Sequence, residues 1–314
     1  MIKVENLTKR YGDKLALDHV SFEIRKGEVL GFLGRNGAGK STTMNIVTGY
    51  ISASEGRVLL DGYDILDDPR MVKRQIGYLP EQPPLYMDMT VESYLRFVCA
   101  IKEVNPRQVK AHLADILELA KITDVRGRLI KNLSKGYRQR VGIAQALAGD
   151  PAVIILDEPT IGLDPQQIIE IRALIKRLGQ NHTLVLSSHI LSEVADVCER
   201  VVVIDRGKII AADTLENLSK GSGPTSRTAI RAAGPEQEVA RALLGIEGVL
   251  KVAPLGTREA DTYDFIIESG KERDIRRPLF AAMARINAPL LMIKPMDATL
   301  EDVFVRLTGG DGEA

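Results

Sequence analysis

The feature that most constrains this chain is a glycine-rich segment, Gly34 to Thr42, that lies between a predicted strand and a predicted helix. It reads Gly-Arg-Asn-Gly-Ala-Gly-Lys-Ser-Thr and matches the pattern GxxxxGK[ST]. Glycines let backbone N–H groups surround phosphate oxygens, and the positive end of the helix dipole attracts the same anion. The pattern therefore predicts a nucleoside triphosphate site. Its candidate residues are Gly34, Asn36, Gly37, Ala38, Gly39, Lys40, Ser41 and Thr42, with Lys40 on the terminal phosphates and Ser41 on Mg²⁺.

A second feature is a pair of carboxylates at the end of an apolar run, Val153-Ile-Ile-Leu-Asp157-Glu158-Pro. The run reads as a buried strand of the sheet that also carries the glycine-rich segment. A buried carboxylate without a partner is costly, so a divalent cation near Asp157 is the natural explanation. Glu158 is then placed to orient or deprotonate the water that attacks the γ-phosphate. The two features together predict hydrolysis of a nucleoside triphosphate.

Strand and helix signals alternate around these features. The first thirty or so residues alternate in strand fashion, with turns at 11–13 and 26–27. Apolar runs at 153–156 and 183–186 flank a helix that starts after Asp164-Pro165, an order that predicts a parallel sheet. Residues 83–149 read as a helical insertion, in which Asn105-Pro106 with Gln108 predicts a helix cap. Residues 201–211 read as a hairpin.

The length of 314 residues predicts a large domain and a smaller one. We expect the large domain at 1–218, with a helical subdomain at about 83–149, and a linker at 219–226. Residues 227–314 read as strand, helix, strand, strand, helix, strand and helix. That order indicates a small ferredoxin-like α/β domain closed by a final helix, which we interpret as a stabilising or dimerising appendage.

The composition narrows the class of protein. Lys and Arg number 42, and so do Asp and Glu, which leaves no electrostatic footprint for nucleic acid or an acidic bilayer. Cys99 and Cys198 form no CxxC pair, so free thiols in a reducing cytosol are expected. No signal-like apolar core or membrane span is evident. We therefore expect a soluble intracellular protein whose contact with a membrane goes through a protein partner.

The segment Leu133-Ser-Lys-Gly-Tyr-Arg-Gln-Arg140 reads as the start of a helix with an unusual first turn. Ser134 stands at the N-cap, and apolar residues follow at helical spacing from Val141 onward. Gly136 falls in the first turn, where glycine weakens a helix by up to about 1 kcal/mol relative to alanine. A glycine at this position indicates that another group approaches the backbone closely.

The ordered set of motifs resembles the ATP-binding cassette subunits of ABC transporters. The resemblance covers about residues 1–218. It rests on the glycine-rich segment, on residues 133–140 directly before the Asp157-Glu158 strand, on Gly162-Leu-Asp164 and on Leu186-Ser-Ser-His189. It implies a P-loop NTPase of the α/β class, with a RecA-like parallel sheet, an antiparallel β subdomain and a helical insertion, that hydrolyses ATP with Mg²⁺.

The resemblance also implies roles for individual residues. In that family each ATP is sandwiched between the phosphate loop of one subunit and the LSGGQ-type segment of the other. Ser134 and the Gly136 backbone would thus meet a γ-phosphate held by a second copy or a homologous cassette, and Asp164 would lie at the dimer interface. Tyr11 resembles the aromatic residue that stacks on adenine. His189 resembles the histidine that contacts the γ-phosphate.

Two segments depart from the common form of the family. Lys135 and Tyr137 stand where the commonest signature has glycine and glutamine. In Ile76-Gly-Tyr-Leu-Pro-Glu-Gln82, the flanking residues place Glu81, not Gln82, at the position of the glutamine that contacts metal and water. The metal-contacting residue of this loop is therefore Glu81 or Gln82, and the alignment favours Glu81.

The end of the sequence, Ala298 to Thr308, and the Tyr-Leu-Pro-Glu loop resemble the ATPases of bacterial ABC-2-type exporters, such as those for gliding motility, sodium or drugs. This implies integral-membrane permease subunits as partners and a cytoplasmic, peripheral place on the inner face of the cell membrane. The alternative is a soluble non-transport ABC ATPase that acts on ribosomes or DNA. The sequence gives this alternative no support, because it has neither a second phosphate loop nor a long coiled-coil insertion. A P-loop kinase or GTPase is a third candidate, but no Asn-Lys-x-Asp guanine reader occurs.

Overall fold

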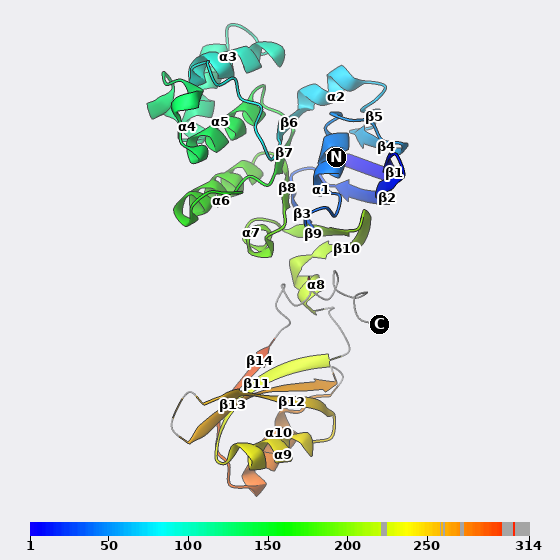
Figure 1. The fold of residues 1–314 in the computed structure, drawn as a ribbon, viewed down its shortest axis with the longest axis vertical. Coiled ribbons are helices and arrows are strands. Elements are labelled where there is room, and N and C mark those ends of the chain that lie inside the picture. The colour runs from blue at the N-terminus through cyan, green and yellow to red at the C-terminus, as the bar shows by residue number, and fades with distance from the viewer. Residues whose placement is uncertain (221–224, 258, 260, 271–272, 297–303, 305–314) are drawn as a thin grey trace. The chain divides into compact units, whose positions relative to one another are not determined.

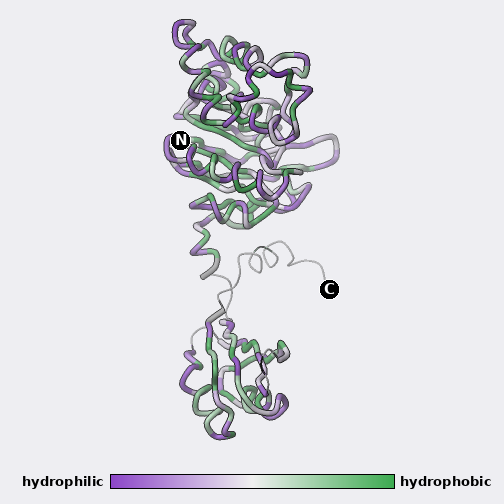
Figure 2. Tube along the Cα trace, turned by 90° about the vertical axis from the view of Figure 1, so that its left-hand side faces the viewer, coloured by the Kyte–Doolittle hydropathy of each residue, from purple (hydrophilic) through white to green (hydrophobic). Residues whose placement is uncertain are grey.

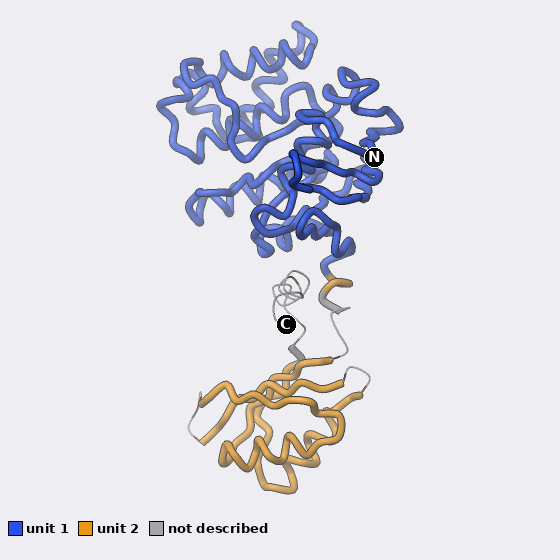
Figure 3. The backbone as a smooth tube through the Cα atoms, turned by 45° about the vertical axis from the view of Figure 1, so that its right-hand side comes forward, with its two compact units in different colours: residues 1–215 blue, residues 216–314 orange. Residues whose placement is uncertain are grey.

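The computed structural model describes residues 1–220, 225–257, 259, 261–270, 273–296 and 304. The chain divides into two compact units, residues 1–215 and 216–314 (Figure 3). Helix α8 (Leu215–Lys220) spans this boundary, and strand β11 begins at Thr225. The linker predicted at 219–226 is therefore too long, because 219–220 end a helix and 225–226 begin a strand. Its middle, 221–224, lies outside the described residues.

Two sheets build the first unit, and one of them is mainly parallel (Figure 1). Its strand order is β10-β9-β3-β8-β7-β6. Among the described strand pairs of this sheet, β10 and β9 are antiparallel, and the others are parallel. The strands are β3 (Val29–Leu33), β6 (Ile76–Leu79), β7 (Val153–Asp157), β8 (Thr183–Ser188), β9 (Arg200–Asp205) and β10 (Lys208–Thr214). The predicted parallel sheet and hairpin are confirmed. Strand β6, at the sheet edge, was not predicted.

The second sheet of this unit is antiparallel and has the order β2-β1-β4-β5. It consists of β1 (Ile2–Tyr11), β2 (Lys14–Ile24), β4 (Glu55–Leu60) and β5 (Tyr63–Asp64). The rings of Phe22 in β2 and Phe32 in β3 lie 5.2 Å apart, and buried residues of both sheets form one hydrophobic cluster. Figure 2 shows the hydrophobic stretches running along the strands, with hydrophilic stretches mostly in the outer turns. The two sheets thus share a core.

Helices cover the parallel sheet and form the insertion (Figure 1). Those outside the insertion are α1 (Lys40–Val47), α2 (Pro69–Gln75), α6 (Pro165–Gly179) and α7 (Leu191–Ala195). The insertion between β6 and β7 holds α3 (Val91–Ile101), α4 (Val109–Leu119), α5 (Lys135–Leu147) and the 3₁₀ turns η1 (Thr123–Val125) and η2 (Ile130–Asn132). Among the described helices, none is long and apolar enough to cross a membrane.

The predicted cap of α4 is wrong in detail. The helix begins at Val109, and its N-cap residue, Gln108, makes no capping bond with its side chain. Asn105 Oδ1 instead accepts a hydrogen bond from the backbone of Arg107 at 3.0 Å. The asparagine therefore shapes a turn just ahead of the helix, a local bond that competes with true capping.

The second unit has the βαββαβ order of ferredoxin-like motifs. Its elements are β11 (Thr225–Ala233), α9 (Glu236–Leu244), β12 (Val249–Gly256), β13 (Thr262–Gly270), α10 (Arg276–Arg285) and β14 (Leu290–Met296). The strands form an antiparallel sheet in the order β12-β13-β11-β14. Both helices contribute to a core around Phe265. The predicted final helix and the exporter-like end at 298–308 fall outside the described residues, apart from Phe304.

The two cysteines are free and buried, and Cys198 gives a pH-dependent prediction. Burial raises the pKa of the Cys198 thiol from 9.0 to about 12. A short iodoacetamide pulse at about pH 8 is expected to spare Cys198 in the folded chain and to alkylate it after unfolding, as peptide mass spectrometry would show. The unfolded thiol ionises first, so the contribution of Cys198 to the free energy of unfolding is lost as pH rises from 9.0 towards 12. Alkylation of the folded chain at the rate of free cysteine would contradict this.

Candidate nucleotide site

The glycine-rich segment forms a loop that joins β3 to α1. Gly39 is the N-cap of α1 and has a φ of 111°, a backbone conformation that residues with a side chain rarely adopt. A Cβ at Gly39 would also lie 2.7 Å from Leu17 Cδ2. Glycine is therefore needed both for the turn and for the contact with β2. No side chain caps this end of the eight-residue helix α1, and the first N–H groups of a helix are suited to bind an anion.

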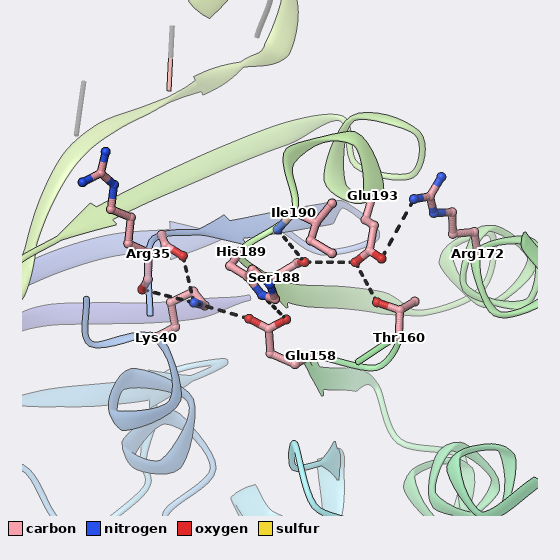
Figure 4. A network of polar contacts seen from close by, with 10 residues as sticks. Arg35, Lys40, Glu158, Thr160, Arg172, Ser188, His189, Ile190 and Glu193 are labelled. Carbon is pink, nitrogen blue, oxygen red and sulfur yellow. Dashed lines mark hydrogen bonds and ion pairs between the residues drawn. The ribbon is translucent and has the colours of Figure 1, made fainter. Parts of the chain in front are cut away.

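Lys40 is held at the start of α1, almost completely buried. Its ammonium donates hydrogen bonds to the carbonyl oxygens of Gly34 at 2.8 Å and Arg35 at 3.3 Å (Figure 4). The same nitrogen lies 3.3 Å from Glu158 Oε1, and each of the two side chains is 6% exposed. A buried cation at a helix N-terminus needs such partners, and a phosphate group would supply the same negative charge.

A cavity of about 550 Å³ opens beside this loop. It is lined by most of the predicted nucleotide-binding residues, namely Tyr11, Asn36, Gly37, Gly39, Lys40, Ser41 and Thr42, and also by Glu81 and Glu158. Gly34 and Ala38 belong to the loop but are buried and do not line the cavity. Lys14, Arg206 and Gly207 line it too, at or beside two turns that the sequence predicts but to which sequence reasoning gave no role in the site.

Tyr11 is the last residue of β1 and lines this cavity. Its side chain is half exposed, as a ring that stacks on a base must be. The Lys9 ammonium lies 5.1 Å from the centre of the Tyr11 ring, a cation–π contact within one strand. Tyr11 thus lines the phosphate-loop cavity with one lysine already against its ring, and its contact with a base stays a prediction.

Asp157 is the last residue of β7 and is 1% exposed. Its Oδ1 has no hydrogen-bond partner among the described residues. Burying a carboxylate oxygen without a partner costs free energy, and such an oxygen is a suitable ligand for a hard divalent cation. No group of three or more His, Cys, Asp or Glu side chains is gathered for a metal in the described part of the chain. The residues thus fit Mg²⁺, which needs one or two protein ligands and takes the rest from phosphate and water.

Glu158 links the phosphate loop to the end of β8. Its backbone has a φ of 49°, and its N–H donates to the carbonyl of Ser187 at 2.9 Å. Its Oε1 faces Lys40, and its Oε2 lies 2.9 Å from His189 Nδ1 (Figure 4). A left-handed backbone at a non-glycine residue stores strain, a feature that clusters at active sites. The carboxylate is thus fixed between a lysine and a histidine, facing the cavity.

His189 directly follows β8 and is the more accessible member of this group, with 34% of its side chain exposed. Its Nδ1 is bonded to Glu158, so its other ring nitrogen is free of this pair. The structure therefore brings together His189, Glu158 and Lys40. His189 does not line the phosphate-loop cavity itself.

A buried glutamate, Glu193, joins this group and was missed by sequence reasoning. It lies on α7 and accepts hydrogen bonds from Thr160 Oγ1 at 2.7 Å and Ser188 Oγ at 3.0 Å (Figure 4). The only available signal was a glutamate between Leu191 and Val194 in a short apolar stretch. That pattern does not distinguish a buried acid from a solvated one.

Ser134 caps α5 as predicted, accepting a hydrogen bond from the backbone of Tyr137 at 3.4 Å. Gly136 is buried, and a Cβ there would lie 2.5 Å from Gln167 Oε1. Within this chain, the group that approaches Gly136 closely is thus the end of a side chain of α6, and the approach of a phosphate held by a second chain stays a prediction. Asp164 caps α6 through a 2.9 Å hydrogen bond from Gln167 N. Ser134, Gly136 and Asp164 do not line the phosphate-loop cavity of their own chain.

Glu81 and Gln82 follow β6 and differ in what they face. Both line a neighbouring cavity of about 610 Å³, but of the two only Glu81 also lines the phosphate-loop cavity. Glu81→Ala is therefore expected to lower the ATPase rate by about 10- to 100-fold, as is typical when a residue that orients a metal-bound water is lost. Gln82→Ala is the matched control, with a rate within about twofold of the parent. The reverse order in steady-state rates would show that Gln82 reaches the site.

Comparisons with known proteins agree with this geometry. Residues 17–161 match the family described as ABC transporter. The chain is 31% identical over 310 residues to the linearmycin resistance ATP-binding protein LnrL of Bacillus subtilis, with 98% of each chain covered. It is 36% identical over 222 residues to the bacitracin transport ATP-binding protein BcrA of Bacillus licheniformis, with 70% of this chain and 72% of BcrA covered.

Solved structures give the same result. A structure of an ATP-binding subunit of an ABC transporter matches with a TM-score of 0.65 and 30% identity, covering 70% of this chain and 92% of the other. The dimeric structure of MJ0796, a bacterial ABC transporter cassette, matches with a TM-score of 0.63 and 28% identity, covering 68% and 98%. A further structure of MJ0796 holds ADP and Pi after hydrolysis. The phosphate loop, the buried acidic strand end and these likenesses lead to one conclusion: the chain belongs to the ABC transporter family, as an ATP-binding and ATP-hydrolysing subunit.

Proposed function

We propose that two copies of this chain, or one copy and a homologous cassette, dimerise head-to-tail around ATP and Mg²⁺. The observation that carries this proposal is that the phosphate-loop cavity and the exposed N-terminus of α5 are separate in one chain. Ser134 is exposed and does not line the cavity, although its helix end is suited to a phosphate. A second chain in opposite orientation would supply the missing half. The dimeric structure of the MJ0796 cassette supports dimerisation.

Within each half, we assign roles from the geometry above. Lys40 and the loop N–H groups hold the β- and γ-phosphates, and Tyr11 contacts the base. Ser41 and Asp157 would hold Mg²⁺, with Glu81 nearby, and the cation would neutralise phosphate charge. Glu158 orients the attacking water and accepts its proton, and His189 steadies the Glu158 carboxylate. ATP binding would close the dimer, and hydrolysis would open it.

We propose export as the transport direction, with an ABC-2-type permease as partner on the inner face of the membrane. The named relatives LnrL and BcrA, concerned with linearmycin resistance and bacitracin transport, support this. The partner, though not the direction, is further supported by an exposed apolar patch beside α3, which we call the α3 patch and which comprises Tyr86, Phe97 and Ile101. The rings of Tyr86 and Phe97 lie 5.5 Å apart, and Ile101 follows one turn later at 62% exposure. Such a cluster is suited to an apolar partner.

The test is purification of the tagged chain from detergent-solubilised membranes of its host, with the captured proteins identified by mass spectrometry. We expect an integral-membrane subunit in the parent sample, and its loss from the double variant Phe97→Lys and Ile101→Lys. The matched control is Phe280→Lys, on α10, where an exposed phenylalanine of the second unit is replaced instead. Capture of ribosomal proteins or nucleic acid in place of a membrane protein would favour the alternative, a non-transport ATPase.

A further inference from the structure

Glu193 is a buried carboxylate for which the proposed mechanism has no role. It is 2% exposed, and a charged group at that depth is costly unless hydrogen bonds satisfy it. Both of its hydrogen bonds go to one oxygen, Oε2, and both donors are hydroxyl groups, those of Thr160 and Ser188. Bonds to a charged acceptor are stronger than those between neutral groups. Glu193 therefore holds these two hydroxyls firmly.

The two hydroxyls belong to the segments that carry the reactive pair (Figure 4). Thr160 lies two residues after Glu158, and Ser188 directly precedes His189. Ser188 Oγ also accepts a hydrogen bond from Ile190 N at 3.0 Å, so the backbone on both sides of His189 is tied to the same glutamate. These hydrogen bonds lie on both sides of the 2.9 Å contact between Glu158 Oε2 and His189 Nδ1.

The other oxygen of Glu193 faces helix α6. Its Oε1 lies 3.9 Å from Arg172 Nη2, while Arg172 Nη1 pairs with Asp196 at 2.6 Å. Arg172 thus keeps a carboxylate partner even when Glu193 is changed. Glu193, Thr160 and Ser188 do not line the phosphate-loop cavity, so a change at Glu193 leaves the phosphate-binding groups intact.

We propose that Glu193 is a positioning residue for ATP hydrolysis, which acts through Thr160 and Ser188 to hold Glu158 and His189 in register. The inference rests on the proposed roles of Glu158 and His189. Its consequence is a split between binding and turnover. A residue that fixes the geometry of the base affects the chemical step, whereas ATP affinity depends on the phosphate loop.

The first test is the pair Glu193→Ala and Glu193→Gln. Glu193→Ala removes the acceptor for both hydroxyls, and we expect kcat to fall at least about tenfold with KM and the calorimetric ATP affinity within about twofold. Glu193→Gln keeps an oxygen at the same reach, and we expect at least about a third of the parent kcat. Ser192→Ala, an exposed neighbour on α7, is the matched control and is expected to be unchanged. An unaltered kcat in Glu193→Ala would overturn the inference.

A second test approaches the same bond from the other side. Thr160→Val removes the hydroxyl at nearly constant shape, and we expect a loss of kcat similar to that of Glu193→Ala, whereas Thr160→Ser keeps the hydroxyl and most of the activity. The double variant Glu193→Ala and Thr160→Val is expected to be no less active than Glu193→Ala alone, because the bond that Thr160→Val breaks is already lost in Glu193→Ala. Effects that multiply instead would overturn the inference. Should Glu193→Ala fail to fold, the comparison of Thr160→Val with Thr160→Ser tests the inference instead. Equal activity of these two variants would contradict the positioning role of Glu193.

Failure of this inference is distinguishable from failure of the proposed function. An active Glu158→Gln variant would remove the base role itself, and the positioning role with it. An inactive Glu158→Gln variant beside a fully active Glu193→Ala variant would remove only the role of Glu193. A parallel loss, in which ATP affinity falls as much as kcat does, would show that Glu193 supports the fold rather than the reactive pair.

Discussion

Glu158→Gln is expected to lower kcat for ATP hydrolysis by about 100- to 10,000-fold, the usual contribution of a general base. The amide keeps the shape of the side chain but does not accept a proton from water. ATP binding should persist, because Lys40 and the loop around it are unchanged, and the closed dimer should accumulate. Steady-state rates and size-exclusion chromatography with ATP measure the two effects. Near-normal turnover would contradict the role assigned to Glu158.

Glu158→Gln is also expected to change the stability of the nucleotide-free chain, which can be measured without ATP hydrolysis. Glu158 is a buried partner of Lys40, so the neutral amide lowers the stability of the nucleotide-free chain. The loss should stay below the about 3–5 kcal/mol typical of breaking a buried pair, because Lys40 keeps two carbonyl acceptors. Added ATP should restore Tm more in the variant than in the parent, since phosphate then partners Lys40. The control for the melting curves is Glu199→Gln, which neutralises an exposed glutamate instead of a buried one.

Ser134→Asp is expected to abolish ATP-dependent dimerisation while leaving the fold intact. Aspartate caps a helix as well as serine does, so α5 should keep its N-terminus. Across a dimer interface, however, the new carboxylate would face a γ-phosphate, and like charges repel strongly where water is scarce. The measurement is the dimer fraction with ATP in the Glu158→Gln background. Thr90→Asp, at the N-cap of α3, is the matched control and should dimerise normally. An equally dimeric Ser134→Asp variant would remove the role in trans.

Mixing two inactive variants sharpens this test. In a heterodimer of Ser134→Asp and Lys40→Ala chains, one composite site carries both changes and the other carries none. Random pairing of equal amounts leaves about a quarter of all sites intact, which sets the highest activity expected of the mixture. Recovery of measurable ATPase activity supports a site shared between two chains. A mixture as inactive as each variant alone, despite heterodimer formation, would contradict it.

The sequence by itself determined the local parts of the site. The phosphate loop, the Asp157-Glu158 strand end and the caps at Ser134 and Asp164 depend on turns, dipoles and hydrogen bonds between residues close in the chain. Such features leave a pattern of fixed spacing, and apolar runs bounded by turns gave the parallel sheet in the same way. The helical insertion also followed from the residue pattern, whereas the antiparallel β subdomain followed from the resemblance that these patterns support.

The tertiary structure alone decided which distant side chains meet. Strand β6 is short and lies at the sheet edge, so its apolar run carried no clear period, and the strand itself was seen only in the fold. The sequence left the choice between Glu81 and Gln82 open, and the fold shows that Glu81 is the one of the two that lines the phosphate-loop cavity. Gly136 signalled a close approach, but the partner, Gln167, is 31 residues away on another helix. Glu193 is bonded to two hydroxyls on two other segments. Contacts of this kind form when strands and helices pack against one another. Because the contacting residues are not separated by any regular spacing in the sequence, the sequence pattern does not predict them.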